Sequence, residues 1–592
     1  LIANEKIKVI IGNPPYSAGA SSANDNNANI SHPNLEKRVK DTYGKESSAN
    51  LAKNTRDTLI QALRMASDKI KDNGIIGFVV NGGFIDATSA DGFRKCVAKE
   101  FSDIYILNLR GNQRTSGETS RKEGGKIFDS GSRASVAIVF FIKDTNAKTN
   151  KIHYYDIGDY LDRQTKLDKL ENFKSVSNVP FINIIPNEKG DWINQRGEDF
   201  DNLMPLKSDK NEYGIFAINA TGIATNRDSW AYNFSKEKLG YSMQKCIATY
   251  NEDLAKFDHQ AFLEKNKNIK KSELYKELSD KDITIDETKI SWTAGLKQNF
   301  INNEKIKEFN QENIRISFYR PFTKEYLYWE KTWNERQSQF SKLFPKNTDE
   351  NLLILTSLMA TKDFSSFIVN SIADLQTLAN TQAFPLYFYQ ENGSKEYAIS
   401  DFALDEFKKQ LQDETINKED IFYYIYAILN HKGYLEKYKF ELSKEAPRVP
   451  ISKDFKSLSI LGKKLAALHL NYENNEMFKE VEFKDGVLAD TDNDEFYKVT
   501  KMKKLGNDIF YNHNITIKNI PNIAYEYKIN GKSAIDWIID RYQISIDKKS
   551  LIENNPNDYQ GSKYIYELLL KIINLSIKSV DLINEISKME CE

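Results

Sequence analysis

The sequence predicts an α/β fold for its first part and a mixed α+β fold for the remainder. An apolar run at 7–12 indicates a buried strand of a parallel sheet. Further strand-like runs alternate with helical stretches up to about residue 145, as in half of a doubly wound sheet. From about residue 200 the sequence changes to short strand-like runs, many aromatic residues and charged helical segments.

The elements of the first part follow in chain order. Residues 17–50 are rich in Ala, Ser and Asn, which indicates a flexible loop. Residues 51–72 carry apolar residues at helical spacing and stop at Asn73-Gly74, so they predict a helix. Short apolar runs predict three more buried strands, at 74–80, 104–109 and 135–143.

The second part contains two segments with clear helical patterns. Residues 253–282 are rich in Lys and Glu, and we expect them to be helical with a mainly solvated face. Residues 422–429 and 434–442 have aromatic and apolar residues at helical spacing. They predict a helical hairpin broken at Gly433, with its tyrosines in the core.

Composition limits the class of protein. A chain of 592 residues is too long for one core, so two to four domains are expected. The formal net charge of −1 excludes a uniformly basic nucleic-acid binder, so DNA contacts would need local basic patches. Scattered Cys96, Cys246 and Cys591 favour a reducing compartment and no metal site. Without a membrane span or signal peptide, we expect a cytoplasmic protein with no membrane partner.

A short motif, Asn13-Pro14-Pro15-Tyr16, directly follows the first predicted strand. Ligands of open α/β sheets bind at the carboxyl ends of the strands. Proline has a fixed φ and no N–H, and it forces the preceding residue into an extended conformation. The four residues therefore form a preorganised polar corner, or, as the simpler alternative, a turn with a core tyrosine.

This motif resembles motif IV of the amino-group DNA methyltransferases, the adenine-N6 type in particular. The resemblance implies that the Asn13 side-chain oxygen and the Pro14 carbonyl accept both protons of the adenine amine. It implies that Tyr16 stacks on the adenine after base flipping. The candidate catalytic residues are Asn13, Pro14, Pro15 and Tyr16.

The same resemblance implies S-adenosylmethionine as the methyl donor. In such enzymes a glycine-rich turn and an acidic residue bind this cofactor, and neither fits ahead of Asn13. We therefore expect the cofactor-binding residues upstream of Leu1, and the chain to be the C-terminal part of a longer polypeptide.

A glycine-rich basic loop separates the third and fourth predicted strands. It contains no Walker A pattern, so binding of nucleotide phosphates is disfavoured. Contact with the DNA backbone and a solvated surface loop are both open. Phe128 is a candidate second aromatic face for the flipped base, or else a core or loop residue. The candidate DNA contacts are Arg110, Arg114, Arg121 and Lys122.

Several further segments resemble the specificity region of the type ISP restriction–modification enzymes. Such enzymes join nuclease, translocase, methyltransferase and target recognition in a single polypeptide. The segments are 108–115 (NLRGNQRT), 222–233 (GIATNRDSWAYN), 319–328 (YRPFTKEYLY), 423–450 (ending APRVP) and 530–542 (NGKSAIDWIIDRY). Together they span nearly the whole chain.

This second resemblance implies a domain order. Residues 1–150 would be the C-terminal portion of a γ-type adenine-N6 methyltransferase, 151–200 a connector, and 201–592 a target recognition domain with up to two subdomains. The fold would then be a partial Rossmann-like methyltransferase sheet followed by a mixed α+β target recognition domain. The implied partners are double-stranded DNA and the missing methyltransferase half, nuclease and ATPase of the same polypeptide.

Two loop-like clusters carry side chains that can read bases. Arg, Asn and Gln make bidentate contacts to guanine or adenine edges. The clusters 226–228 and 334–337 lie near tryptophans, and Arg227 and Arg336 are the first candidates for reading a guanine. A structural ion-pair cluster is the alternative for both. Arg320, before Pro321, is expected to be structural.

The leading functional hypothesis is site-specific DNA adenine-N6 methylation within a restriction–modification system. One alternative is a DNA-recognition fragment without catalysis of its own. Another is the C-terminal part of an ATP-dependent restriction endonuclease or translocase, although no motif for that chemistry occurs in the sequence.

Overall fold

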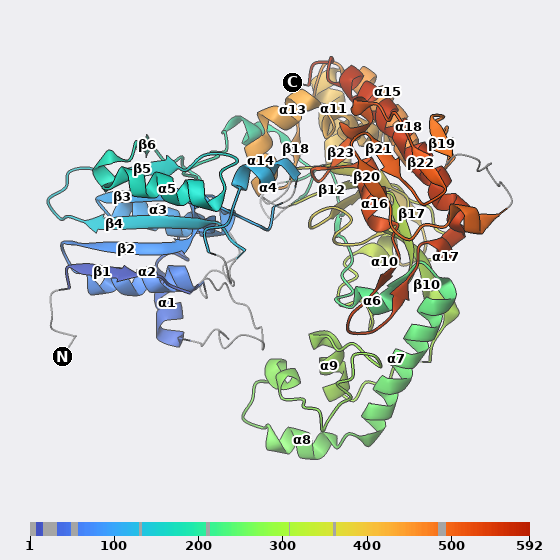
Figure 1. Cartoon of the computed structure of the whole chain (residues 1–592), viewed down its shortest axis with the longest axis horizontal. Coiled ribbons are helices and arrows are strands. Elements are labelled where there is room, and N and C mark those ends of the chain that lie inside the picture. Colours follow the sequence, from blue (N-terminus) through green and yellow to red (C-terminus); the bar gives the residue numbers. More distant parts are fainter. Residues whose placement is uncertain are drawn as a thin grey trace. The chain divides into compact units, whose positions relative to one another are not determined.

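The protein is a mixed α/β chain that divides into two compact units in the computed structural model (Figure 1). The structure describes residues 7–15, 32–48, 57–115, 117–128, 133–208, 213–306, 308–358, 363–483 and 493–591. The first unit contains the described residues up to Asp201 together with Phe440–Glu445. The second contains most of the chain from Asn202 onward.

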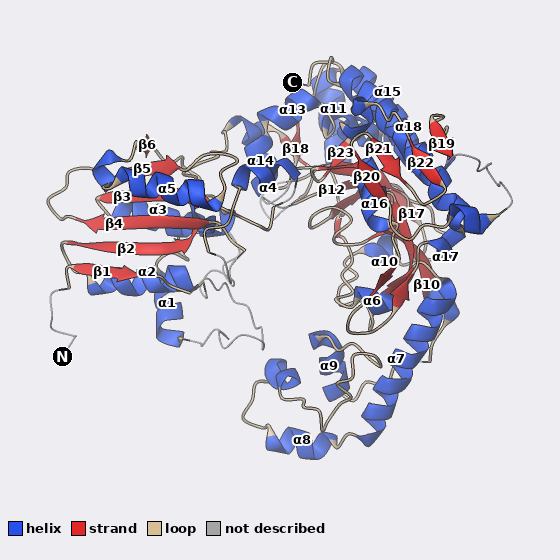
Figure 2. Ribbon diagram, viewed as in Figure 1, coloured by secondary structure: helices blue, strands red, loops and turns tan. Residues whose placement is uncertain are grey.

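The first unit is built on a six-stranded sheet with the order β1-β2-β4-β3-β5-β6 (Figure 2). Its strands are β1 (Val9–Gly12), β2 (Gly74–Asn81), β3 (Asp103–Arg110), β4 (Val136–Lys143), β5 (Lys151–Asp156) and β6 (Ile182–Ile184). β1 pairs parallel with β2, and β3 with β5, whereas β4 is antiparallel to both β2 and β3. The carboxyl ends of β1, β2, β3 and β5 therefore lie at one edge. The four predicted strands are confirmed, although the fourth runs antiparallel.

Helices cover one face of this sheet well. The helices of the unit are α1 (Pro33–Asp41), α2 (Thr58–Lys69), α3 (Asp91–Glu100), α4 (Gly117–Glu123), α5 (Arg163–Phe173) and α14 (Lys439–Lys444). α2 and α3 bury residues such as Leu63 and Val97 in one core with the strands. The predicted helix at 51–72 is confirmed over Thr58–Lys69 as α2, whereas residues 51–56 lie outside the described residues. The loop expected at 17–50 is wrong in part, because α1 forms there and buries Val39. Residues 16–31 lie outside the described residues.

The other face of the sheet is covered only in part. Leu107 and Leu109 pack there, with residues of α5 against them. Near β1 the same face is open, with Val9 57%, Ile11 83% and Ile75 41% exposed. Parallel sheets are normally covered on both faces, and an exposed apolar edge strand is an aggregation hazard. The face of the sheet near β1 is therefore an exposed apolar surface.

Residues 151–200 differ from the connector expected there. β5 pairs with β3, α5 packs on the sheet, and β6 adds the far edge strand. These residues therefore extend the first unit, and the division falls between Asp201 and Asn202. The sequence hides β5 because its six residues carry few purely apolar side chains.

The second unit contains three four-stranded sheets among its described residues, with the orders β14-β10-β11-β9, β13-β12-β15-β8 and β19-β22-β21-β20. Its strands are β7 (Met204–Pro205), β8 (Ala220–Thr221), β9 (Tyr232–Asn233), β10 (Ile314–Arg320), β11 (Thr323–Tyr328), β12 (Leu353–Thr356), β13 (Ser366–Val369), β14 (Ile372–Ala373), β15 (Gln382–Pro385), β16 (Tyr387–Tyr389), β17 (Lys395–Tyr397), β18 (Arg448–Val449), β19 (Val481–Phe483), β20 (Lys503–Leu505), β21 (Asp508–Phe510), β22 (Ile515–Ile517), β23 (Lys528–Ile529), β24 (Lys532–Ser533), β25 (Ser545–Ile546) and β26 (Glu553–Asn554).

Helices surround these sheets, and α7 packs on β9 and β11 at one end and extends toward α8 and α9 at the other (Figure 1). The helices are α6 (Asp228–Ala231), α7 (Lys236–Lys256), α8 (His259–Lys265), α9 (Ala294–Ile301), α10 (Phe340–Leu343), α11 (Asp401–Leu411), α12 (Lys418–Ile428), α13 (Lys432–Lys437), α15 (Phe455–Leu470), α16 (Ala534–Arg541), α17 (Asn557–Gln560) and α18 (Ser562–Ile586). Among the described residues, no helix is both long and apolar enough to cross a bilayer.

Two helical predictions for this unit have different outcomes. Residues 253–282 form the end of α7, then α8 and a short 3-10 helix, and they bury Phe262 and Leu274 in a core with Trp333. Most other residues of 253–282 are exposed or half-buried, so the expected helical stretch with a mainly solvated face is confirmed, with a few apolar residues on its buried side. The predicted hairpin of 422–429 with 434–442 is wrong. The first of these helices, α12, packs on α15, and Gly433 lies inside α13 and does not break a hairpin.

The packing of α12 on α15 depends on a glycine. A Cβ at Gly462 would lie 2.0 Å from the Tyr423 carbonyl oxygen, so only glycine allows this approach. Tyr424, Tyr426 and Tyr434 are fully buried, which confirms that these tyrosines belong to the core.

Candidate nucleic-acid interface

The Asn-Pro-Pro corner stands at the carboxyl end of β1. Asn13 and Pro15 are exposed, Pro14 is buried, and the Pro15 carbonyl accepts a hydrogen bond from the Thr58 hydroxyl at the start of α2. Within the part of the chain that the structure describes, neither the Asn13 amide nor the Pro14 carbonyl has a hydrogen-bond partner. The two acceptors named from the sequence are therefore available. Tyr16 lies outside the described residues.

Three carboxylates at this edge are already engaged. Asp57 caps α2 by accepting from two backbone N–H groups, and Asp91 accepts from the Ser48 N–H and hydroxyl. Asp86 pairs with Lys444, with 2.8 Å between the charged atoms. A carboxylate that binds ribose must be free to accept from its hydroxyls. None of these three carboxylates could accept from a ribose hydroxyl without giving up a contact within the chain.

The basic loop after β3 is held in place by a buried lysine. Lys166 on α5 is fully buried, and its ammonium donates to the carbonyls of Glu123 and Gly125 at 2.7 and 2.8 Å. Burial lowers the pKa of Lys166, against the opposing charge of Glu123. Gly124 has φ +66°, and a Cβ there would lie 2.1 Å from the Leu161 carbonyl oxygen. The backbone of the loop is therefore fixed by specific contacts, which the sequence did not reveal.

The cations of this loop differ in their availability. Arg110 donates to Asp156 at 2.7 Å and also to Asp159, which favours the structural alternative for this residue. Lys122 is exposed, with its ammonium 4.0 Å from Asp159.

Three further candidates occupy exposed positions in the loop. The Arg114 side chain is exposed and has no partner among the described residues. Arg121 is exposed as well, and Phe128 is 38% exposed. Their contacts with DNA stay predictions.

In the second unit, Arg320 joins two of the segments singled out from the sequence. Its guanidinium donates to Asp374 at 2.7 Å and lies 3.9 Å from Asp228. The Tyr319 hydroxyl donates to Asp228 at 3.1 Å. Burial raises the pKa of Asp374 to about 6, although Arg320 acts to lower it. Segments 222–233 and 319–328 are therefore held together by one buried charged cluster.

Arg227 is buried, with 4% of its surface exposed. Its guanidinium donates to the Thr293 hydroxyl at 2.6 Å and lies 5.1 Å from the centre of the Trp333 ring. Burial lowers the pKa of Arg227 to about 10. This environment favours the structural alternative for Arg227 over contact with a base.

Arg336 has the opposite setting. Its side chain is exposed, whereas its backbone pairs with Ala224 through two hydrogen bonds of 2.9 Å. The Ser338 hydroxyl also accepts from the Thr221 N–H at 3.0 Å. Backbone hydrogen bonds thus bring the segments that carry the clusters 226–228 and 334–337 together. Of the two candidate arginines, Arg227 is buried and Arg336 is accessible.

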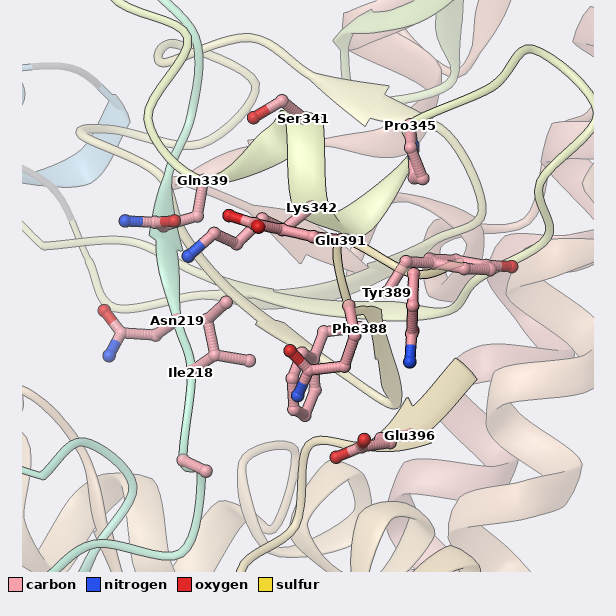
Figure 3. Close-up of a pocket in the computed structure, with 13 residues that line it drawn as sticks. Ile218, Asn219, Gln339, Ser341, Lys342, Pro345, Phe388, Tyr389, Glu391 and Glu396 are labelled. Atoms are coloured by element: carbon pink, nitrogen blue, oxygen red, sulfur yellow. The ribbon is translucent and has the colours of Figure 1, made fainter. Parts of the chain in front are cut away.

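A pocket with a volume of about 990 Å³ opens beside these segments (Figure 3). Its walls come from α10, the hairpin of β16 and β17, and residues 217–219. Its lining includes the polar side chains Asn219, Gln339, Lys342 and Glu391 and the rings of Phe388 and Tyr389. None of these was singled out from the sequence, because they come from three separate segments without a local motif.

Glu325 on β11 gives the second unit a testable pH dependence. It is 3% exposed and accepts from the Asn554 amide at 3.0 Å. Burial raises the pKa of Glu325 from an ordinary 4.5 to about 7, against the opposing hydrogen bond from Asn554. The carboxyl therefore favours the folded state most below pH 4.5, and this contribution is lost as the pH rises through 7.

Glu325→Gln should remove the loss of unfolding free energy that accompanies ionisation of this carboxyl, a loss of about 3 kcal/mol at most. We expect the variant to gain stability relative to the wild type above pH 7 and to show a flatter pH profile. Denaturant unfolding at pH 5 and pH 8 measures this, with the exposed Glu277→Gln as the matched control. Identical pH profiles for Glu325→Gln and the wild type would contradict the assignment.

No cluster suited to a metal ion occurs among the described residues, in that no three His, Cys, Asp or Glu side chains come together to hold one.

The chain is similar to three solved structures of DNA complexes. It is 40% identical to a nuclease-deletion mutant of the Type ISP restriction-modification enzyme LlaGI in complex with a DNA substrate mimic, with a TM-score of 0.86. It is 37% identical to the ATP-dependent Type ISP enzyme LlaBIII bound to DNA, with a TM-score of 0.87. It is 30% identical to DrdV in a DNA complex, with a TM-score of 0.83.

These similarities cover nearly all of this chain but only part of each relative. They cover 99% of this chain for LlaGI and LlaBIII and 98% for DrdV. The chain spans 45% of the LlaGI chain, 37% of LlaBIII and 57% of DrdV. No curated protein matches the chain.

The family model of the Type ISP C-terminal specificity domain matches residues 214–568, which is more than half of the chain. This confirms the resemblance of the later segments to the specificity region of restriction–modification enzymes. The chain therefore belongs to the family of Type ISP C-terminal specificity domains.

Proposed function

We propose that the chain recognises the DNA target of a Type ISP restriction–modification enzyme that methylates adenine at N6. The observation that carries this proposal is the similarity over 99% of the chain to LlaGI in complex with a DNA substrate mimic. Double-stranded DNA is then the partner of the second unit, and the first unit presents the adenine-binding corner.

The corner supports the adenine assignment through its chemistry. The exocyclic amine of adenine is a poor nucleophile because its lone pair is delocalised into the ring. Acceptance of both amine protons by the Asn13 oxygen and the Pro14 carbonyl would localise that lone pair for methyl transfer. Thr58 holds the adjacent Pro15 carbonyl, so the acceptors are preorganised. Tyr16 would stack on the flipped base.

Two observations support a second candidate, a recognition fragment that needs further polypeptide for catalysis. The face near β1 exposes Val9, Ile11 and Ile75, and the carboxylates at the carboxyl edge are engaged. We propose that the rest of the methyltransferase half covers this face and holds S-adenosylmethionine. Nuclease and ATPase parts would lie in the same polypeptide. Calorimetry of the isolated chain with S-adenosylmethionine tests this second candidate. It predicts no tight binding, and micromolar binding would show that the cofactor site lies within the chain.

Substitutions at one arginine, Arg336, and one lysine, Lys122, should distinguish contact with base edges from contact with the DNA phosphate backbone. Arg336→Ala should weaken binding to the cognate duplex by about 1–3 kcal/mol and relax preference at one base position. Lys122→Ala should instead weaken binding to all sequences alike and reduce the salt slope by about one unit. Affinities for cognate and singly substituted duplexes across a salt series measure both effects.

The matched control is Lys464→Ala, an exposed lysine on α15 outside both candidate surfaces. Its affinities should equal those of the wild type. If the wild type bound cognate and substituted duplexes equally, target recognition by this chain would be refuted.

A further inference from the structure

The pocket beside α10 contains amide side chains with no partner of their own. Among the described residues, nothing bonds to the side-chain amides of Asn219, Gln339 and Gln390 or to the Lys342 ammonium. The amide of Gln298, by contrast, donates to Asn302 at 3.3 Å. Unengaged donors and acceptors gathered in one pocket are available to a polar ligand.

The chemistry of the pocket fits nucleobase edges better than phosphate. Among the charged side chains of its lining, Lys342 stands against Glu391 and Glu396, so the lining has an excess of negative charge that disfavours phosphate. Asn and Gln amides pair with adenine N6 and N7, and a lysine pairs with guanine O6 and N7. Figure 3 shows the polar ends of Asn219, Gln339 and Lys342 on the same side of the pocket.

Two residues that line the pocket lie close in the chain to the paired segments that carry Arg336. The backbone of 336–338 runs beside 221–224 through the bonds of Arg336 with Ala224 and of Ser338 with Thr221. Gln339 follows Ser338 directly, and Asn219 lies two residues before Thr221. One pair of adjoining segments therefore presents Arg336, Gln339 and Asn219, and α10 adds Lys342.

We infer that Asn219, Gln339 and Lys342 determine sequence specificity by reading base edges of the target duplex. This inference rests on the proposed role of the chain in target recognition. Asn219 and Gln339 present the amide pair suited to adenine, and Lys342 presents a donor suited to guanine. The rigidity of their setting comes from the backbone bonds of the two segments rather than from contacts of the side chains themselves.

The test is selection of bound sequences from a randomised duplex library by the full-length protein and its variants. Gln339→Ala and Asn219→Ala should each lose preference at a single position, with discrimination there reduced about 5- to 150-fold. Gln339→Glu keeps the side-chain shape but turns a donor into an acceptor, so it should change the preferred base at the same position. Lys342→Ala should act at a different position.

The exposed Gln410→Ala on α11 and Lys464→Ala on α15 are the matched controls and should select the wild-type sequence. If the wild type selected a sequence and all four pocket variants selected the same one, the pocket assignment would fall while target recognition stood. If the wild type selected no sequence, the proposed function and this inference would both be refuted.

Discussion

Replacement of Asn13 by alanine is expected to reduce adenine methylation by about 10²–10³-fold in the full-length enzyme. The change removes one of two hydrogen-bond acceptors for the adenine amine at the carboxyl end of β1. The Pro14 carbonyl would remain, and Thr58 would still hold the Pro15 carbonyl, so the corner should keep its shape. DNA binding should stay largely intact, because its specificity is proposed to reside in the second unit.

The measurement is single-turnover methyl transfer to a cognate duplex, with affinity determined separately. Asn13→Asp keeps an oxygen acceptor and should retain more activity than Asn13→Ala. The control is Asn146→Ala, an exposed asparagine in the turn between β4 and β5. Near-normal methyl transfer by Asn13→Ala would remove the catalytic assignment of the corner.

The strands of the first unit could be predicted because their signals are local. Runs such as 74–80 and 136–142 consist of apolar residues and glycine, which is typical of a strand inside a largely covered sheet. β5 was missed because it mixes polar and aromatic residues, and its place in the sheet depends on pairing with β3. The antiparallel direction of β4 follows from the same non-local pairing.

The candidate site divides in the same way. The Asn-Pro-Pro corner is a contiguous motif behind a strand, so its position at the carboxyl edge could be predicted. The burial of Arg227 could not, because it depends on Trp333 and Thr293, which are distant in sequence. The pocket beside α10 was missed since Asn219 and Gln339 meet only through the folding of separate segments.

The buried cluster around Arg320 leads to the second large prediction. Arg320→Met should lower the unfolding free energy of the second unit by about 3–5 kcal/mol near neutral pH. The change leaves the Asp374 carboxylate, which is only 3% exposed, without the cation that pairs with it. Asp228 also loses a nearby positive charge. Methionine fills much of the same space, so the cost should come mainly from the uncompensated carboxylates.

The pH dependence of this cost identifies its cause. Burial already raises the pKa of Asp374 to about 6, and loss of Arg320 should raise that pKa further. Since the protonated carboxyl tolerates burial, the destabilisation should shrink as the pH falls below 6. The double variant Arg320→Met/Asp374→Leu should recover part of the lost stability at neutral pH, because it removes both charges.

Denaturant unfolding at pH 7.5 and pH 5 measures these effects, and Lys464→Met serves as the surface control. Arg320 also joins segment 222–233, whose Ala224 pairs with Arg336, to segment 319–328. Arg320→Met should therefore weaken sequence selection at neutral pH, and the double variant should restore part of it. A cost below about 1 kcal/mol at pH 7.5, or one that does not change with pH, would show that the cluster does not hold the specificity region together.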